Sequence, residues 1–205
     1  MSRPRRSLPG RLAVLLGSTL LALLALELAV RWLGPTFRPR SLDDKRLFTR
    51  FDPELGWANR ADVTAVVSGP GYVHRATHSA AALRDREHAR ARTPGIRRVL
   101  VLGDSFVWGL GVADDEIFPR LLALHRSHIE TIAMGTSGYG TDQELLWYSR
   151  DGAPYRPDLV VLALYLPNDA RSNLGDRACS RRKPRFELVD GALRLTGTPV
   201  PRETR

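Results

Sequence analysis

The stretch that decides the fold is RRVLVLGDSFVWG, residues 97–109. Its continuous apolar run from Val99 to Leu102 is typical of a strand buried inside a parallel sheet. The run ends in Gly103, Asp104 and Ser105. Because open parallel sheets place their ligands beyond the carboxyl ends of their strands, the pattern predicts a serine hydroxyl at the functional edge of a sheet.

Strand and helix patterns alternate after this stretch. Apolar spacing at Phe118, Leu121 and Leu122, continued by His125, predicts a helix, and residues 129–134 read as a second strand. A capping-box pattern at residues 141–144 opens a helix to about residue 150, and residues 159–164 form a third strand. This order predicts an α/β domain with a parallel sheet and right-handed crossovers. Residues 186–195 predict a hairpin that turns at Asp190 and Gly191.

Three loops of this predicted sheet share one edge and carry complementary chemistry. The first offers Ser105 as a nucleophile. The second, residues 135–141, is rich in glycine and leads into a helix amino terminus, where free backbone N–H groups stabilise negative charge. The third supplies the side-chain amide of Asn168. Acyl transfer needs a nucleophile beside donors aimed at an oxyanion, and these loops together supply both.

These residues resemble the SGNH (GDSL) hydrolase family, whose blocks run Gly-Asp-Ser, a glycine, Gly-x-Asn-Asp and Asp-x-x-His. The resemblance covers residues 50–195, including a segment over 77–85 that looks like the one preceding the domain in membrane-anchored relatives. It implies a three-layer, flavodoxin-like sheet and no metal or organic cofactor. It also implies Ser105 as nucleophile and oxyanion-hole N–H, Gly138 as a backbone donor and Asn168 as a side-chain donor.

The chain departs from the family pattern at two places. Leu166 and Pro167 stand where the third block usually has glycine, and no histidine follows His128. The family's base and its aspartate come from the fourth block, so we expect a sheet incomplete at its carboxyl end and little esterase activity from this chain alone. His74, His78 and His128 are expected in loops or solvent. The alternative function is a truncated or degenerate relative that serves as a membrane-anchored binding module.

Other nucleophile and phosphate motifs fit less well. Val107 occupies the position where a Gly-x-Ser-x-Gly elbow requires glycine. Phe106 is incompatible with an Asp-x-Asp phosphatase, and there is no Gly-Lys-Ser/Thr sequence for a P-loop.

The amino terminus predicts a membrane anchor. A basic segment, residues 1–11, precedes a largely apolar run at 12–33, which as a helix reaches about 33 Å and spans a hydrocarbon core of about 30 Å. Glu27 and Arg31 lie one turn apart and can pair. A cleaved signal peptide is the competing interpretation, but no convincing cleavage site follows the run. We expect a single-pass protein, its amino terminus inside and its domain extracytoplasmic, although the second flank is basic as well.

Composition limits the remaining classes. The 205 residues carry a net charge of +9, supplied almost wholly by arginine. Because no aromatic residues interleave with these arginines, specific nucleic-acid binding is not expected. Cys179 is the single cysteine, which excludes an internal disulfide and a cysteine zinc site. Residues 34–95 form a connector with short strands, and 96–205 form a partial α/β domain. The expected partners are membrane lipid, through residues 12–33, and an ester or acylated small molecule or glycan.

Overall fold

A computed structural model describes residues 8–33, 47–69, 71–124 and 126–203. The chain divides into two compact units, residues 1–39 and 40–205. The first contains helix α1 (Leu8–Leu33), which is long and apolar enough to cross a membrane, as a signal sequence also is. Glu27 and Arg31 form the expected ion pair, at 2.9 Å. The predicted apolar helix is therefore present.

The second unit is a mixed α/β structure around three parallel strands. These are β5 (Arg97–Gly103), β6 (Ile129–Gly135) and β7 (Leu159–Ala163), in the spatial order β6-β5-β7. In the centre of the sheet Val101 lies opposite Ala133 on one side and Val161 on the other. Leu100, Val101 and Leu102 of β5 are buried, since this strand is the central one and helices cover both faces of the sheet. The three predicted strands and their parallel direction are confirmed.

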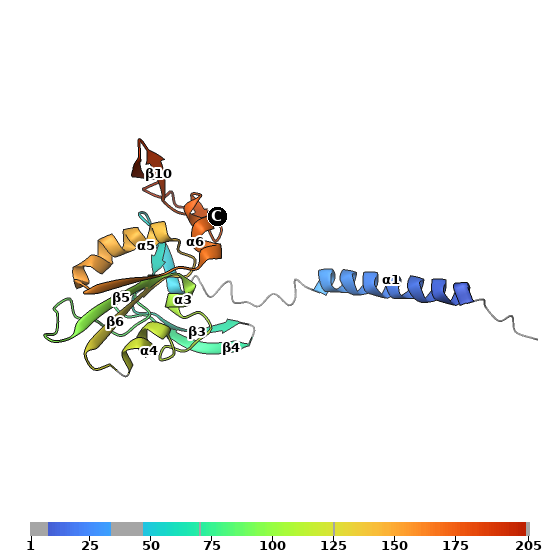
Figure 1. The fold of residues 1–205 in the computed structure, drawn as a ribbon, viewed down its shortest axis with the longest axis horizontal. Coiled ribbons are helices and arrows are strands. Elements are labelled where there is room, and N and C mark those ends of the chain that lie inside the picture. Colours follow the sequence, from blue (N-terminus) through green and yellow to red (C-terminus); the bar gives the residue numbers. More distant parts are fainter. Residues whose placement is uncertain (1–7, 34–46, 70, 125, 204–205) are drawn as a thin grey trace, which may run out of the picture. The chain divides into compact units, whose positions relative to one another are not determined.

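Helices lie on both faces of this sheet (Figure 1). One face carries α5 (Thr141–Trp147), continued by a π-helical turn (Tyr148–Gly152) and a 3-10 turn (Ala153–Tyr155). The other carries α4 (Phe118–Leu124). The short helix α3 (Ser105–Trp108) follows β5, and α6 (Leu166–Asn173) follows β7. The core under α5 joins Leu100 and Met134 to Trp147 and Tyr155.

Four antiparallel hairpins complete the unit. They pair β1 (Thr49–Asp52) with β2 (Gly56–Asn59), β3 (Thr64–Gly69) with β4 (Tyr72–Thr77), β8 (Arg177–Ala178) with β9 (Arg181–Arg182), and β10 (Arg185–Val189) with β11 (Ala192–Thr196). Asp190 and Gly191 both have positive φ, as a two-residue type I′ turn requires, so the predicted turn is confirmed. Leu55, Trp57 and Leu83 belong to the same core cluster as Leu100, which joins the connector to the sheet.

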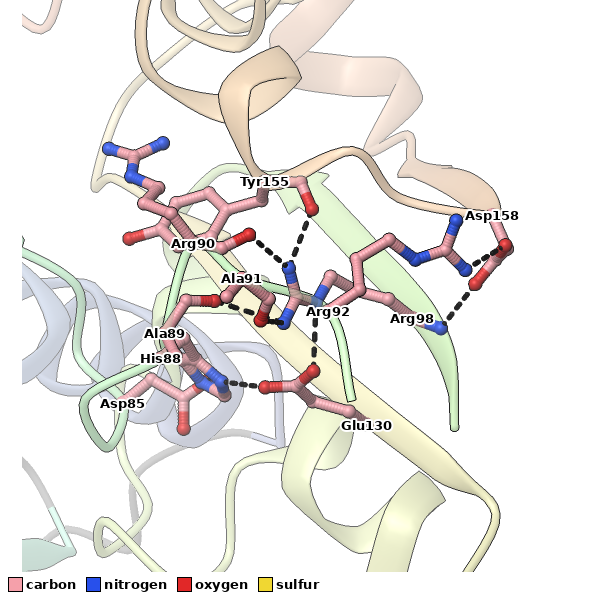
Figure 2. A network of polar contacts seen from close by, with 10 residues as sticks. All are labelled: Asp85, His88, Ala89, Arg90, Ala91, Arg92, Arg98, Glu130, Tyr155 and Asp158. Carbon is pink, nitrogen blue, oxygen red and sulfur yellow. Dashed lines mark hydrogen bonds and ion pairs between the residues drawn. The ribbon is translucent and has the colours of Figure 1, made fainter. Parts of the chain in front are cut away.

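A buried arginine fastens residues 89–91 to the amino-terminal end of the sheet (Figure 2). The Arg98 guanidinium is buried and donates to one carboxylate and four carbonyls: Glu130 at 2.8 Å, Tyr155 at 2.6 Å, Ala89 at 2.9 Å, Ala91 at 3.2 Å and Arg90 at 3.3 Å. These five bonds use the full donor set of a guanidinium. Arg98 therefore acts as a structural cross-link.

The same carboxylate of Glu130 also reaches a buried histidine. His88 Nδ1 lies 2.8 Å from Glu130, and its Nε2 lies 3.0 Å from Asp85 (Figure 2). Burial alone would lower the pKa of His88, but these two carboxylates outweigh it and raise the pKa above its usual value. His88 thus belongs to a charged network far along the strands from Ser105.

Candidate active site

The loops after the three parallel strands meet through one side-chain amide. Asn168, at the start of α6, donates from Nδ2 to the Asp104 carboxylate at 3.0 Å. The same nitrogen lies 3.2 Å from the carbonyl oxygen of Tyr139, in the loop after β6. The structure therefore brings together the three loops that carry the predicted residues Ser105, Gly138 and Asn168.

Ser105 is the first residue of α3, directly after β5. Asp104 caps this helix, because its Oδ1 accepts a hydrogen bond from the Phe106 N–H at 2.9 Å. Gly103 allows the end of β5 to pack closely against α3, since a Cβ there would lie 2.3 Å from Cγ2 of Val107. The strand-turn-helix geometry thus fixes the backbone of Ser105 at the sheet edge.

Gly138 occupies a turn that favours glycine. Its φ is +84°, and the Tyr139 N–H donates to the Thr136 carbonyl at 3.2 Å, as in a type II turn. A Cβ at Gly138 would lie 2.7 Å from Sγ of Cys179. Neither the Gly138 N–H nor the Ser105 N–H has a hydrogen-bond acceptor within the described residues. Two backbone donors therefore stay available near Asn168.

Four buried carboxyl groups lie in or next to the loops after the parallel strands: Asp104, Asp142, Glu144 and Asp169. Lys183 pairs with Asp142, whereas both oxygens of Glu144 lack a hydrogen-bond partner among the described residues. Burial, reinforced by the charges of Asp169, Asp104 and Asp142, raises the pKa of Glu144 to about 8. Burial also raises the pKa of Asp169. The interior beside the site thus holds a carboxyl group that is largely uncharged at neutral pH.

The capping box predicted at residues 141–144 is wrong in detail. Helix α5 begins at Thr141, but the residue that precedes it, Gly140, is the N-cap and makes no side-chain capping bond. Glu144 is completely buried and makes no capping bond. Because the Glu144 side chain is buried in the interior, it does not reach back to cap the helix as the local sequence spacing predicts.

None of the described histidines forms a hydrogen bond with the hydroxyl of Ser105. His78, expected in a loop or solvent, is buried: its Nδ1 lies 2.8 Å from the Arg60 carbonyl and its Nε2 accepts from the Trp108 indole at 2.9 Å. Burial lowers the pKa of His78 to about 4. His78 is thus a neutral structural side chain with both nitrogens engaged.

The other histidines are also separate from Ser105. His74, expected in a loop or solvent, lies instead in β4 with both ring nitrogens buried. His128 is exposed and lies in the loop before β6, as expected. His125 lies outside the described residues. No group of three potential metal ligands occurs in the described part of the chain.

Apolar side chains flank the nucleophile. Phe106, next to Ser105, is 60% exposed, and its ring centre lies 4.9 Å from that of Tyr165. Leu166, at the start of α6, is 74% exposed. Exposed apolar groups beside a serine can contact the carbon atoms of an acyl group.

Sequence reasoning missed the Asp104–Asn168 hydrogen bond and the buried Glu144. Asp104 could have been recognised as a helix cap, because it stands immediately before a short apolar helix. Glu144 gave no such signal, because its environment depends on Asp104 and Asp169, which are distant in sequence. No protein-family model and no curated protein matches this chain.

Proposed function

We propose that this chain is a membrane-anchored serine hydrolase or acyl transferase of the SGNH type, built on a three-layer, flavodoxin-like sheet. The observation that carries the proposal is the amide of Asn168, which bridges Asp104 and the Tyr139 carbonyl. This bridge brings together the loops that carry Ser105, Gly138 and Asn168, the three residues to which the proposal gives roles in acyl transfer. The alternating α/β order and the parallel sheet support the same assignment.

The proposed reaction begins with attack of Ser105 Oγ on the carbonyl carbon of an ester. A C–O bond forms, the carbonyl electron pair moves to its oxygen, and the serine proton passes to a general base. The N–H groups of Ser105 and Gly138 would donate to the resulting oxyanion. Asn168 would join them by giving up its longer bond to Tyr139, at 3.2 Å. The same base would protonate the leaving alcohol, and water or a second alcohol would release the acyl group from Ser105.

The general base is not assigned to any described residue. The resemblance to SGNH hydrolases implies a histidine from an Asp-x-x-His block for this role. The described histidines are separate from Ser105, so the proposal gives this chain the nucleophile and oxyanion half of the chemistry. A small base added to the solution could replace the unassigned general base, and it would therefore test whether Ser105 acts as a nucleophile.

The substrate class follows from the surroundings of the site. Phe106 and Leu166 would contact the acyl group, and α1 would keep the site at a membrane that it crosses once. The basic residues before the helix favour an amino terminus inside the cell, and in that orientation the second unit would lie outside the cytoplasm. We propose an acylated small molecule or an O-acyl glycan as substrate.

Imidazole rescue tests the proposal. The full chain in phosphatidylcholine nanodiscs is incubated with p-nitrophenyl acetate and increasing imidazole, and hydrolysis is compared with that of Ser105→Ala. We expect little turnover without imidazole, a Ser105-dependent rise with it, and acetyl-Ser105 by mass spectrometry. Equal rates for both proteins at every imidazole concentration, without acetylation, would overturn the proposal. Robust turnover without imidazole would contradict the proposal that this chain supplies only the nucleophile and the oxyanion donors.

A non-catalytic binding module is the second candidate. The observation that favours it is that both hydrogens of the Asn168 amide already have acceptors, Asp104 and Tyr139. A module of this kind would bind an acylated ligand without acetylation of Ser105. The imidazole experiment separates the two functions because only a hydrolase half-site acquires the acetyl group.

A further inference from the structure

A second feature of the 40–205 unit is a basic cleft of about 360 Å³. It lies between the β1–β2 hairpin, Arg181 of β9 and residues 201–203. Four arginines line it, together with a single acidic side chain: Arg50, Arg60, Arg181, Arg202 and Glu203. Its volume lies in the range of pockets that hold small ligands.

The positive charge of the cleft is not neutralised by its own carboxylate. Glu203 already pairs with two arginines outside the cleft, Arg177 at 2.7 Å and Arg182 at 3.7 Å. Neither Arg60 nor Arg202 forms an ion pair with a carboxylate in the described ranges. Arg60 and Arg202 therefore contribute positive charge to the lining that no described carboxylate neutralises.

Arg50 adds to this positive charge. Its nearest carboxylate is Asp52, at 3.6 Å. Asp52 is held more closely by Arg150, at 3.1 Å, and it also accepts the backbone N–H groups of Glu54 and Leu55. Several competing partners share this carboxylate, so Arg50 keeps donors for a ligand.

Two of these guanidinium groups, those of Arg60 and Arg202, are positioned by contacts that leave hydrogen-bond donors available. Arg202 lies over the ring of Phe51, with its Cζ 5.6 Å from the ring centre. Arg60 donates its Nε to the Thr49 carbonyl at 3.0 Å, and its two terminal nitrogens make no hydrogen bond within the described residues. A stacked guanidinium keeps its N–H edge free, and such an edge matches the oxygens of a phosphate group.

We propose that this cleft binds a phosphate group carried by a polyol or sugar. A ligand with a single carboxylate would neutralise only one arginine. A phosphate group carries more negative charge, and its several oxygens can accept hydrogen bonds from more than one guanidinium group. A volume of about 360 Å³ leaves room for the polyol or sugar as well. The proposal is independent of the chemistry at Ser105.

The cleft adjoins the candidate active site through Trp57. This nearly buried side chain lines the cleft, and its indole N–H donates to the Ser137 carbonyl at 3.2 Å. Ser137 immediately precedes Gly138 in the turn after β6. Trp57 therefore contacts both the cleft and the turn that carries the predicted oxyanion donor.

The binding test uses the full chain in phosphatidylcholine nanodiscs and titrates glycerol 3-phosphate by calorimetry. We expect saturable binding that falls at least about tenfold in Arg60→Gln/Arg202→Gln, because charge-assisted hydrogen bonds are lost. Arg75→Gln/Arg86→Gln is the matched control: it removes the same charge from exposed positions outside the cleft and should keep the affinity within about twofold. Absence of saturable binding, or equal loss in both double variants, would overturn the proposal.

A second arm identifies the source of the phosphate. Nanodiscs that contain phosphatidylglycerol present the same chemistry as a lipid headgroup. If the headgroup fills the cleft, glycerol 3-phosphate will bind more weakly to the wild-type chain in these discs than in phosphatidylcholine discs. Unchanged affinity assigns the site to soluble or glycan-borne phosphate. This experiment measures phosphate binding, whereas the imidazole experiment measures acetylation of Ser105. Either proposal can therefore be overturned while the other stands.

Discussion

At the scale of the residue, Asn168 is the side chain on which the candidate site depends. It reaches Asp104 and the Tyr139 carbonyl with one amide group. We predict that Asn168→Ala lowers the imidazole-dependent acetylation of Ser105 by about 10²- to 10³-fold, the usual cost of removing one oxyanion donor. The rate at saturating ester should fall more than the apparent KM rises.

Thermal unfolding of Asn168→Ala provides the control for folding. Loss of two hydrogen bonds costs roughly 1 to 3 kcal/mol, so the variant should still unfold cooperatively. A folded variant with wild-type acetylation would show that Asn168 organises the loops without contributing to the oxyanion.

Glu144 makes a prediction about pH. The pKa of Glu144 is about 8 in the folded chain, against 4.5 for an ordinary glutamate. As the pH rises, this carboxyl group therefore loses its proton at a lower pH in the unfolded chain than in the folded chain. This group therefore lowers the free energy of unfolding progressively between about pH 4.5 and 8, by a total on the order of 5 kcal/mol. Glu144→Gln cannot ionise, and its advantage over the wild type should grow across that window.

Thermal unfolding at pH 5, 6.5 and 8 measures this difference. Glu187→Gln, on the β10–β11 hairpin, is the matched control and should follow the wild-type pH dependence. A constant difference between Glu144→Gln and the wild type at all three pH values would refute a neutral Glu144.

At the scale of the element, the His88 network holds the segment before β5 against the sheet. Asp85 and Glu130 raise the pKa of His88 above its usual 6.5. The protonated histidine therefore adds stability that is fully present below pH 6.5 and is lost as pH rises through the folded-state value. We predict that His88→Gln destabilises the chain by about 1 to 3 kcal/mol at pH 6 and by less at pH 9.

Denaturant unfolding at the two pH values tests this prediction. His128→Gln changes an exposed loop histidine and should leave stability unaltered at both. An equal loss for His88→Gln at pH 6 and pH 9 would mean that the histidine contributes packing and not charge.

Local patterns were sufficient to predict the three parallel strands and the hairpin that turns at Asp190 and Gly191. Each depends on residues that are close in sequence, such as the apolar run of β5. The polar cross-links were not predictable in this way. Arg98 and Glu130 are 32 positions apart, and the charged segment before β5 gave no sign that its carbonyls bind a buried guanidinium. His78 was misassigned for the same reason, since Trp108 lies 30 residues away.

At the scale of the whole molecule, one edge of the parallel sheet carries uncovered apolar side chains. Strand β7 pairs only with β5 within the described ranges, and Leu162 is 45% exposed. Such an edge favours association between chains, and a lysine on it opposes pairing. We predict that Leu162→Lys reduces concentration-dependent self-association of the detergent-solubilised chain.

Sedimentation velocity over a range of protein concentrations measures the effect. Leu188→Lys introduces the same charge at a 72% exposed position on the β10–β11 hairpin and should leave self-association unchanged. Equal reductions in both variants would assign the effect to net charge and not to the sheet edge.

The indole of Trp57 offers a route by which the basic cleft and the candidate active site could influence each other. It lines the basic cleft and holds the Ser137 carbonyl through one hydrogen bond. If an occupant of the cleft changes the affinity of a reversible ligand at Ser105, that ligand must change the affinity of the cleft by the same factor. Under that condition, a reversible ligand of the candidate site at Ser105 would be detectable through the change that it causes in phosphate affinity at the cleft.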